Sequence, residues 1–293
     1  MKKKKLIKED NNLFYLYNPI PIVKQEAVIV IQTILRTHGI SYQFGETVDL
    51  NELDVVNRMR FENYIDRLIQ YKEIRGHTIE GLMAGLFDGT LNTNKSGIWD
   101  YEVSQGKIEQ KYLEKDTESP SIGGFTTALN NLGPEVKKEI KYLLETTYGR
   151  KDMNLFMVND DSLTLYKKNI LEAVLTDITA ITFNSGDRLK TFYLTKNQAI
   201  DLFSDMKNVR EPRKLGSNEL RVSSAVLKDN GSSFDIIKPV VSDDERKPYL
   251  DLTKEDRAIA KIFGPYSGKI RPDILNWIQK NKEQFKNLVN TLL

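Results

Sequence analysis

Residues 99–112, WDYEVSQGKIEQKY, constrain the fold most, because apolar and charged side chains alternate along both halves of this stretch. Alternation with a period of two is typical of a strand that has one face in the core. With Gln105-Gly106 as a two-residue turn, the stretch predicts a β-hairpin. Its apolar face then carries Trp99, Tyr101, Val103, Ile108 and Tyr112.

The other face of this hairpin carries charge. In the predicted register Asp100 lies opposite Lys111, and Glu102 lies opposite Glu109. Like charges directly opposite one another destabilise a sheet unless a cation lies near them. Ile98 and Leu113 border the charged face and suggest a partly closed cleft. A polar face that simply meets solvent is the alternative.

Helices and strands are interspersed along the rest of the chain, which predicts a mixed α/β (α+β) fold. Helical spacing indicates helices over 23–36, 51–74 and 134–148, and one from Thr78, as N-cap, to Gly89. Thr195 and Gln198 form a capping box for a helix to about Met206. Strands are expected over 179–183 and 188–194, and a hairpin over 219–241 with its turn at Asn230-Gly231. Two segments near the end, RAIAKIF and then PDILNWIQKNKEQFKNLVNTLL, are expected to be helical, with Pro272 at a first helical position.

Length and composition bound the kind of protein. A chain of 293 residues, 40% hydrophobic, can form one large domain or two, which we place at 1–206 and 207–293. No apolar run is long enough to span a bilayer, and no apolar stretch follows the basic start MKKKKLIKEDNN. We therefore expect a cytoplasmic protein that does not bind membranes.

The residue types present limit the available chemistry. The chain has no cysteine and only two histidines, His38 and His77, which excludes disulfides, cysteine–zinc sites and thiol nucleophiles. Metal chemistry would then depend on oxygen ligands, which select hard cations such as Mg²⁺. Carboxylates on adjacent strands can hold Mg²⁺ beside a phosphate, and a neighbouring ammonium can position water and offset growing negative charge.

These residues resemble the PD-(D/E)XK nuclease superfamily. Its pattern is an aspartate at one strand, a hairpin, and (D/E)-x-K in the next strand, often preceded by a helix that bears a glutamate. Asp100 matches the aspartate, Glu109 and Lys111 match the triplet, and Glu80 is placed like the helical glutamate. Trp99 replaces the usual proline. The resemblance covers residues 76–132.

The resemblance implies a restriction-endonuclease-like core, a central mixed sheet flanked by helices, with an added C-terminal α/β recognition segment. It implies a Mg²⁺-dependent endonuclease that acts on double-stranded DNA and is most like a type II restriction endonuclease. Such an enzyme is expected to be a homodimer and to lie in the cytoplasm of a prokaryote. Asp100 and Glu109 would hold the metal and Lys111 would assist the water. Glu80 could support catalysis or serve only the helix dipole, and Glu102 could be a third ligand or a bystander.

Residues 207–221 concentrate basic and amide side chains that suit contact with DNA phosphates and bases. The candidates are Arg210, Arg213, Lys214, Asn218 and Arg221. A solvated charged loop is the alternative, because the net charge of the whole chain is only +2.

Other interpretations remain open. A repair or recombination nuclease would use the same chemistry, whereas a non-enzymatic DNA-binding or phage structural protein would use none of it. Residues 83–90, MAGLFDGT, also resemble the LAGLIDADG helix of homing endonucleases, although Thr90 stands at the catalytic position. An ordinary core helix explains the same stretch.

Overall fold

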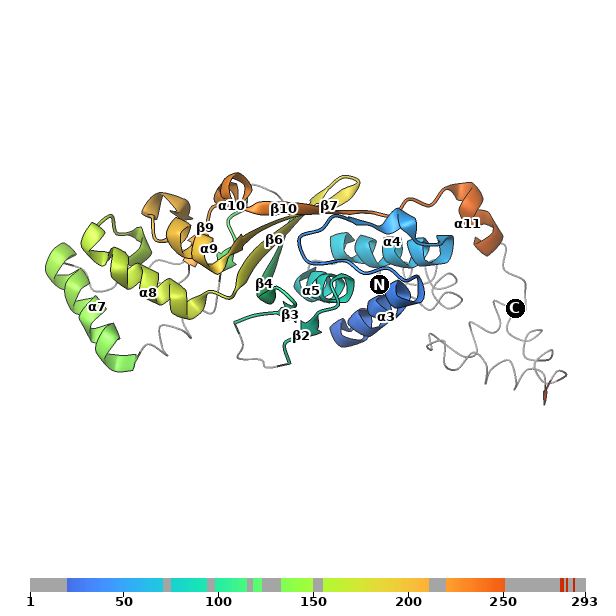
Figure 1. Cartoon of the computed structure of the whole chain (residues 1–293), viewed down its shortest axis with the longest axis horizontal. Coiled ribbons are helices and arrows are strands. Elements are labelled where there is room, and N and C mark those ends of the chain that lie inside the picture. Colours follow the sequence, from blue (N-terminus) through green and yellow to red (C-terminus); the bar gives the residue numbers. More distant parts are fainter. Residues whose placement is uncertain are drawn as a thin grey trace, which may run out of the picture. The chain divides into compact units, whose positions relative to one another are not determined.

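The computed structural model describes residues 20–70, 75–93, 98–114, 118–122, 133–149, 155–210 and 220–250, together with 280, 281, 283 and 287 (Figure 1). The chain forms two compact units. The larger combines Val23–Val48 with Leu68–Ile237, and the smaller includes Asp49–Arg67 and residues from Lys238 onward. Residues 207–237, which we assigned to the recognition segment, lie in the larger unit.

A seven-stranded mixed sheet organises the described residues, as the predicted α/β class requires. The strands in spatial order are β1 (Val48–Asp49), β10 (Ser232–Ile237), β7 (Arg188–Thr195), β6 (Ile178–Ser185), β4 (Gly106–Leu113), β3 (Tyr101–Val103) and β2 (Thr90–Leu91). β4 and β6 are parallel, while β2–β3, β3–β4, β6–β7 and β7–β10 are antiparallel pairs.

One face of the sheet carries Leu113, Ile181, Phe183 and Leu194, which pack in a large hydrophobic core. The helices α8 (Thr164–Val174) and α9 (Lys196–Phe203) bury Ile170, Val174, Ala199 and Phe203 in the same core. A three-stranded sheet also contributes to it. That sheet consists of β5 (Ser121–Ile122), β9 (Leu220–Val222) and β8 (Val209–Arg210).

The opposite face of the large sheet carries an aromatic cluster. Phe44 makes edge-on contacts with Phe87, Tyr193 and Phe234 at centroid distances of 5.1–5.4 Å. Tyr193 points away from the first core because its neighbours Phe192 and Leu194 belong to that core. Aromatic pairs of this geometry add to the energy of burial.

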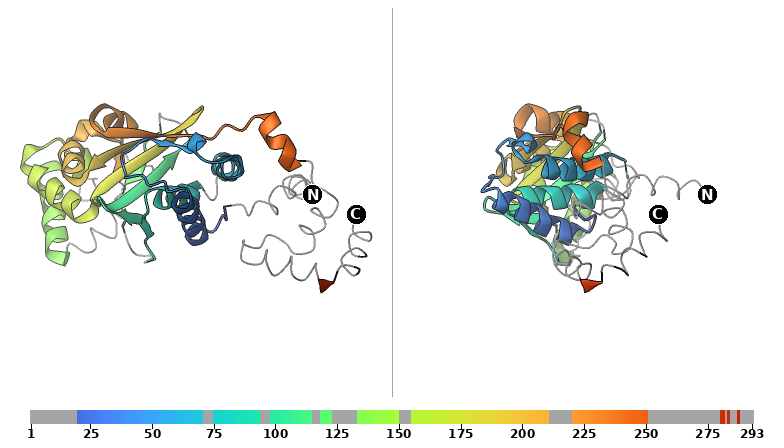
Figure 2. Two further views of the ribbon diagram at one scale, coloured as in Figure 1. Left: turned by 45° about the vertical axis from the view of Figure 1, so that its right-hand side comes forward. Right: turned by 90° about the vertical axis from the view of Figure 1, so that its right-hand side faces the viewer.

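Two helices cover the β3–β4 end of the sheet. α5 (Arg75–Leu86) lies against β3 and β4, and α3 (Lys24–Thr37) lies beside α5 (Figures 1 and 2). The helices approach closely at Gly85, where a Cβ atom would come within 2.7 Å of the Ile31 side chain. Gln32 donates to the carbonyl of Gly89 at 3.0 Å. This close packing fixes α3 against α5.

A chain of buried polar side chains crosses four central strands. Tyr101 Oη donates to Gln110 Oε1 at 3.0 Å, and Gln110 Nε2 donates to Thr182 Oγ1 at 2.9 Å. The hydroxyls of Thr182 and Thr191 are 2.8 Å apart. The side chains therefore connect β3, β4, β6 and β7 in addition to the backbone ladder.

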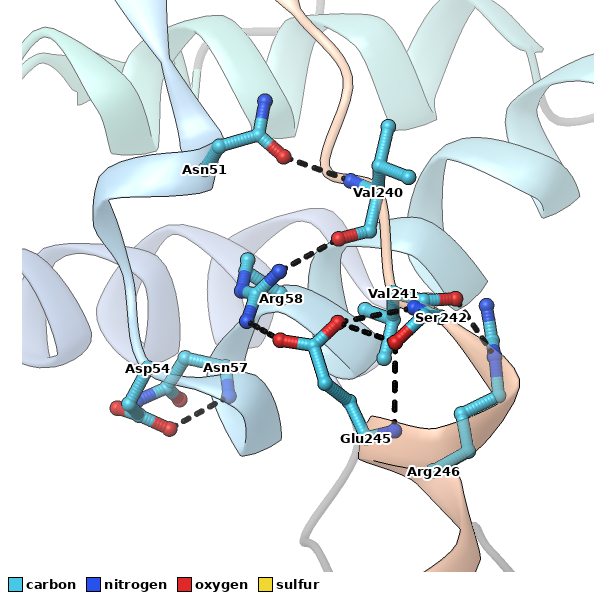
Figure 3. A network of polar contacts seen from close by, with 9 residues as sticks. All are labelled: Asn51, Asp54, Asn57, Arg58, Val240, Val241, Ser242, Glu245 and Arg246. Atoms are coloured by element: carbon cyan, nitrogen blue, oxygen red, sulfur yellow. Dashed lines mark hydrogen bonds and ion pairs between the residues drawn. The ribbon is translucent and has the colours of Figure 1, made fainter.

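The smaller unit includes most of α4 (Val55–Gln70) and the helix α11 (Asp243–Leu250). Arg58 on α4 donates to the carbonyl of Val240 at 2.6 Å and to Glu245 Oε1 at 2.5 Å (Figure 3). The other carboxylate oxygen of Glu245 accepts from the Ser242 backbone N–H at 2.9 Å, while Ser242 Oγ accepts from the Glu245 N–H. Ser242 and Glu245 thus form a capping box for α11.

Two local predictions were wrong. The predicted hairpin over 219–241 is instead the strand β9, the helix α10 (Ser224–Asn230) and the strand β10. The two strands β9 and β10 belong to different sheets. Adjacent Val226 and Leu227 are both buried, which a half-buried strand does not allow, and Gly231 N–H closes the helix on the Leu227 carbonyl at 2.8 Å. The helix predicted from Thr78 begins at Arg75, so Thr78 lies inside it.

Several predicted features fall outside the described residues. These are the basic start of the chain, Tyr71 in the second predicted helix, the segment RAIAKIF, and most of PDILNWIQKNKEQFKNLVNTLL. Within the last segment Lys280, Glu283 and Asn287 are described, and they are helical as predicted. The other predicted helices and strands are present, namely α3, α4, α7 (Gly133–Tyr148), β6, β7 and α9 with its Thr195–Gln198 capping box. No helix in the described part of the chain has the length and apolar character needed to cross a membrane.

Replacing Gly85 by alanine should push α3 away from α5 and destabilise the protein by about 1–3 kcal/mol, because the new methyl group overlaps Ile31. Gly76→Ala on the same helix is the matched control. There the nearest atom to the new Cβ is Glu80 Oε1 at 3.8 Å, and alanine favours the helix by up to about 1 kcal/mol. Urea denaturation measures both effects, and equal stability of the two variants would contradict this packing.

Candidate functional site

The β3–β4 hairpin has a register two residues away from the predicted one. Tyr101 pairs with Ile108, Glu102 with Lys107, and Val103 with Gly106, so Ser104-Gln105 is the turn and the predicted register is wrong. A shift of two residues leaves every side chain on its face. The buried residues Tyr101, Val103 and Ile108 therefore share one face, as alternation predicted.

Asp177, just before β6, explains this register. Its carboxylate accepts from the Lys107 backbone N–H at 2.8 Å and lies where a side chain on residue 106 would be, 2.7 Å from an ideal Cβ. Only glycine fits there, and Gly106 also has φ of +128°. Gly106 thus enters the ladder beside Asp177 instead of forming the turn.

The corrected register changes the position of Glu102. Its side chain is exposed and lies opposite Lys107, not opposite Glu109. The like-charge pair that suggested a bound cation is therefore absent. A metal-ligating role for Glu102 stays a prediction, without the pairing that motivated it.

Asp100, Glu109 and Lys111 come together at the start of this hairpin. Asp100 directly precedes β3, donates its backbone N–H to the Ile108 carbonyl at 2.8 Å, and accepts from the Gln110 backbone N–H through Oδ2 at 2.7 Å. On β4, Lys111 Nζ lies 2.8 Å from Glu109 Oε1. Glu109 is 4% exposed. The Asp100 carboxylate is thus held by a backbone N–H of β4, and the Glu109 carboxylate is paired with the Lys111 ammonium.

Glu80 reaches the same place from α5. It is buried, and its charge acts on both Asp100 and Lys111. We call Glu80, Asp100, Glu109 and Lys111 the acidic cluster. The structure thus brings together the four residues that the sequence assigned to catalysis.

Burial and crowding of charge set the electrostatics of the acidic cluster. Burial, and then repulsion by Glu80 and Glu109, raises the pKa of Asp100 to about 6, although Lys111 and the Gln110 N–H oppose this rise. Burial lowers the pKa of Lys111, but attraction by Glu109 and Asp100 outweighs it and the pKa is raised overall. Lys111 is therefore an ammonium at neutral pH, and burial together with the neighbouring carboxylates disfavours the ionised form of Asp100.

Three neighbours of the acidic cluster were not found by sequence reasoning. Lys24 on α3 lies with Nζ 2.5 Å from Glu80 Oε2. Gln110, which lies between Glu109 and Lys111 in the sequence, hydrogen-bonds to Tyr101 and Thr182 in the buried polar chain. A polar residue on the apolar face of the hairpin was the sequence signal that could have shown this role. Thr179 on β6 is the residue paired with Glu109 on β4, and it is fully buried. Its hydroxyl has no hydrogen-bond partner among the described residues.

The donor atoms of the acidic cluster suit a hard cation. Among the described residues no three acidic, histidine or cysteine side chains lie close enough together to hold a metal ion. Mg²⁺, however, is commonly bound by one or two carboxylates, with water and substrate phosphate completing its shell. Asp100 and Glu109 can supply such a pair, and the unpaired hydroxyl of Thr179 beside Glu109 leaves a polar group for an added ligand or water.

Two predicted DNA-contacting residues lie side by side in the small sheet. Arg210 on β8 is directly opposite Arg221 on β9, and Arg210 is exposed. Arg210 Nη2 also donates to Ser223 Oγ at 3.2 Å. Like charges in directly opposite positions are unfavourable unless an anion lies near them. Arg213, Lys214 and Asn218 lie outside the described residues.

The chain was compared with protein-family models, with curated proteins and with solved structures, and none of the three comparisons found a match.

Asp100→Asn should stabilise the metal-free protein at neutral pH, because it removes a carboxylate whose ionisation the folded state opposes. A raised pKa means that the folded state loses stability as pH rises from about 4, the ordinary value, to about 6. The gain of the variant should thus be near zero below about pH 4 and reach about 1–3 kcal/mol above pH 6. Urea denaturation across this pH range measures it.

Glu102→Gln is the matched control, because Glu102 is an exposed carboxylate two residues farther along the chain and lies opposite Lys107. The gain of Asp100→Asn above pH 6 should exceed any gain of Glu102→Gln, because burial and nearby carboxylates raise the pKa of Asp100. A stability gain for Asp100→Asn that is independent of pH would argue against the charge crowding.

Proposed function

We propose that the protein is a Mg²⁺-dependent endonuclease that hydrolyses phosphodiester bonds of DNA. The observation that carries the proposal is the convergence of Asp100, Glu109 and Lys111, from two adjacent strands, with Glu80 from a helix. Two carboxylates and an ammonium in this arrangement match the chemistry of a phosphoryl transfer that needs no histidine, cysteine or serine nucleophile. The expected relatives of such an enzyme are the PD-(D/E)XK nucleases, which its hairpin residues resemble.

Each residue has a role that follows from its charge. Asp100 and Glu109 would hold the cation, which when bound supplies positive charge to polarise the scissile phosphate and to lower the pKa of water. Lys111 is protonated at neutral pH, so it can donate hydrogen bonds to a phosphate oxygen or to the attacking water but cannot accept the proton of that water. Its ammonium offsets negative charge that grows in the transition state.

The Arg210–Arg221 pair supports DNA as the substrate. Two arginines in directly opposite positions on neighbouring strands can both donate to phosphate oxygens, and a phosphate would offset their like charges. Both arginines belong to the same compact unit as the acidic cluster. The added proposal that the enzyme is a type II restriction endonuclease, a homodimer acting on duplex sites in a prokaryotic cytoplasm, depends on the resemblance.

Asp100→Asn, Glu109→Gln and Lys111→Met should each lower the rate of plasmid cleavage in Mg²⁺ by at least about a hundredfold, because each removes a charge that acts on the reacting phosphate. Glu102→Gln and the double variant Glu135→Gln, Lys137→Met are controls and should cleave normally. The second control alters the same Glu-x-Lys spacing on a helix, α7, instead of on a strand.

The same digest separates the alternatives. Discrete fragments favour a restriction enzyme, and smears or cuts at junctions favour a repair or recombination nuclease. No cleavage of any DNA by the unsubstituted protein, with or without Mg²⁺, would overturn the proposal in favour of a non-enzymatic protein.

Arg210→Ala and Arg221→Ala should each weaken DNA binding at all sequences and reduce the slope of log K against log salt by about one, as expected when one phosphate contact is lost. Binding is measured in Ca²⁺ or without metal, so that the DNA stays intact. Lys138→Ala, an exposed lysine on α7, is the control. An unchanged slope in both arginine variants would exclude this pair from the DNA interface.

A further inference from the structure

Glu80 is an unusual residue for its position. Every residue from Thr78 to Leu86 in α5 is buried, and Glu80 is the only charged one among them. A buried carboxylate is costly unless it is paired. Its partner is Lys24, whose Nζ lies 2.5 Å from Glu80 Oε2, with only 18% of the lysine side chain exposed. His77 Nδ1 is farther away, at 3.7 Å, and its side chain is largely exposed.

Stability alone does not explain this ion pair. Replacing a buried pair by apolar residues of similar size is often neutral or favourable, because both charges lose hydration. α5 is otherwise apolar between Thr78 and Leu86, so an apolar residue at position 80 would suit the core. The carboxylate is nonetheless present, and it repels Asp100 in the acidic cluster.

The packing of α3 holds the ammonium in place. Lys24 and Ile31 are two helical turns apart on α3, and Ile31 packs against Gly85 where α3 comes close to α5. At the ends of the two helices Arg36 pairs with Asp88 at 2.7 Å. The packing of α3 against α5 therefore positions Lys24 next to Glu80.

We propose that Lys24 is the resident counter-ion of Glu80 and sets the affinity of the acidic cluster for divalent cations. This inference rests on the proposed function and deepens it, because it names what regulates metal binding at the same site. Lys24 occupies Glu80 in the metal-free protein, which limits repulsion among the carboxylates. Lys24 also offsets the negative charge with which Glu80 would attract a cation held by Asp100 and Glu109, so Lys24 raises the metal concentration that the site requires. Lys24 is thus a positioning residue that acts through Glu80.

The test is Mn²⁺ binding by calorimetry at about pH 8, where free carboxyl groups are ionised. Lys24→Met should bind Mn²⁺ about tenfold more tightly than the unsubstituted protein, because one competing positive charge is lost at short range. Lys24→Arg keeps the charge and should bind as the unsubstituted protein does. Lys24→Gln, which can still donate a hydrogen bond to Glu80, serves if Lys24→Met folds poorly and should also bind more tightly.

Two controls assign the effect to Glu80. In a Glu80→Gln background, Lys24→Met should change Mn²⁺ affinity less than about threefold, since the carboxylate that Lys24 occupies is absent. Lys107→Met removes a lysine from β4 that faces Glu102, and it should also leave the affinity within about threefold. Unchanged affinity in Lys24→Met and Lys24→Gln, or an effect that persists with Gln at position 80, would overturn the inference.

The outcome distinguishes this inference from the proposed function. If the unsubstituted protein binds Mn²⁺ and cleaves DNA but the Lys24 variants bind with the same affinity, only the inference fails. If the Lys24 variants bind more tightly as expected and no form cleaves DNA, only the endonuclease proposal fails. If no form binds Mn²⁺, both fail.

Discussion

The structure depends on the buried amide of Gln110. Its side chain joins Tyr101 on one side to Thr182 on the other, and its backbone N–H holds the carboxylate of Asp100. Buried polar groups that are fully paired fix one arrangement of the strands, since any shift would leave them unpaired. Gln110 is also the residue between Glu109 and Lys111. The strand β4 therefore carries both the amide that fixes the register of the sheet and two of the charged residues of the acidic cluster, Glu109 and Lys111.

The acidic cluster places stability and chemistry in opposition. Glu80, Asp100 and Glu109 carry three negative charges in a buried place, and Lys24 and Lys111 compensate for two of them. Burial, and then repulsion by Glu80, raises the pKa of Asp100. A protein that needed only a stable fold would gain by neutralising this place. The cluster is thus a feature that stability does not account for, and this is the physical basis for looking for function there.

The sequence predicted the faces of the hairpin because side chains alternate with a period of two, but the same period hides a shift of two residues. Only the contact of Gly106 with Asp177, seventy-one positions later in the chain, decides the register. Lys24 was not predictable for a similar reason, since it meets Glu80 across 56 residues through helix packing. The helix α10 was missed because Asn230-Gly231 is a strong turn signal, although adjacent buried Val226 and Leu227 argue for a helix.

The order of strands has a consequence for how the chain can be divided. β10, residues 232–237, lies against β7 for six residue pairs, so the central sheet is completed by a segment far along the chain. A fragment ending at residue 206 would leave the long edge of β7 without its neighbour. Such an edge offers unpaired N–H and C=O groups to any other chain that has the same defect. The two halves of this sequence are thus unsuited to exchange as independent modules, and a fragment of this kind would tend to aggregate.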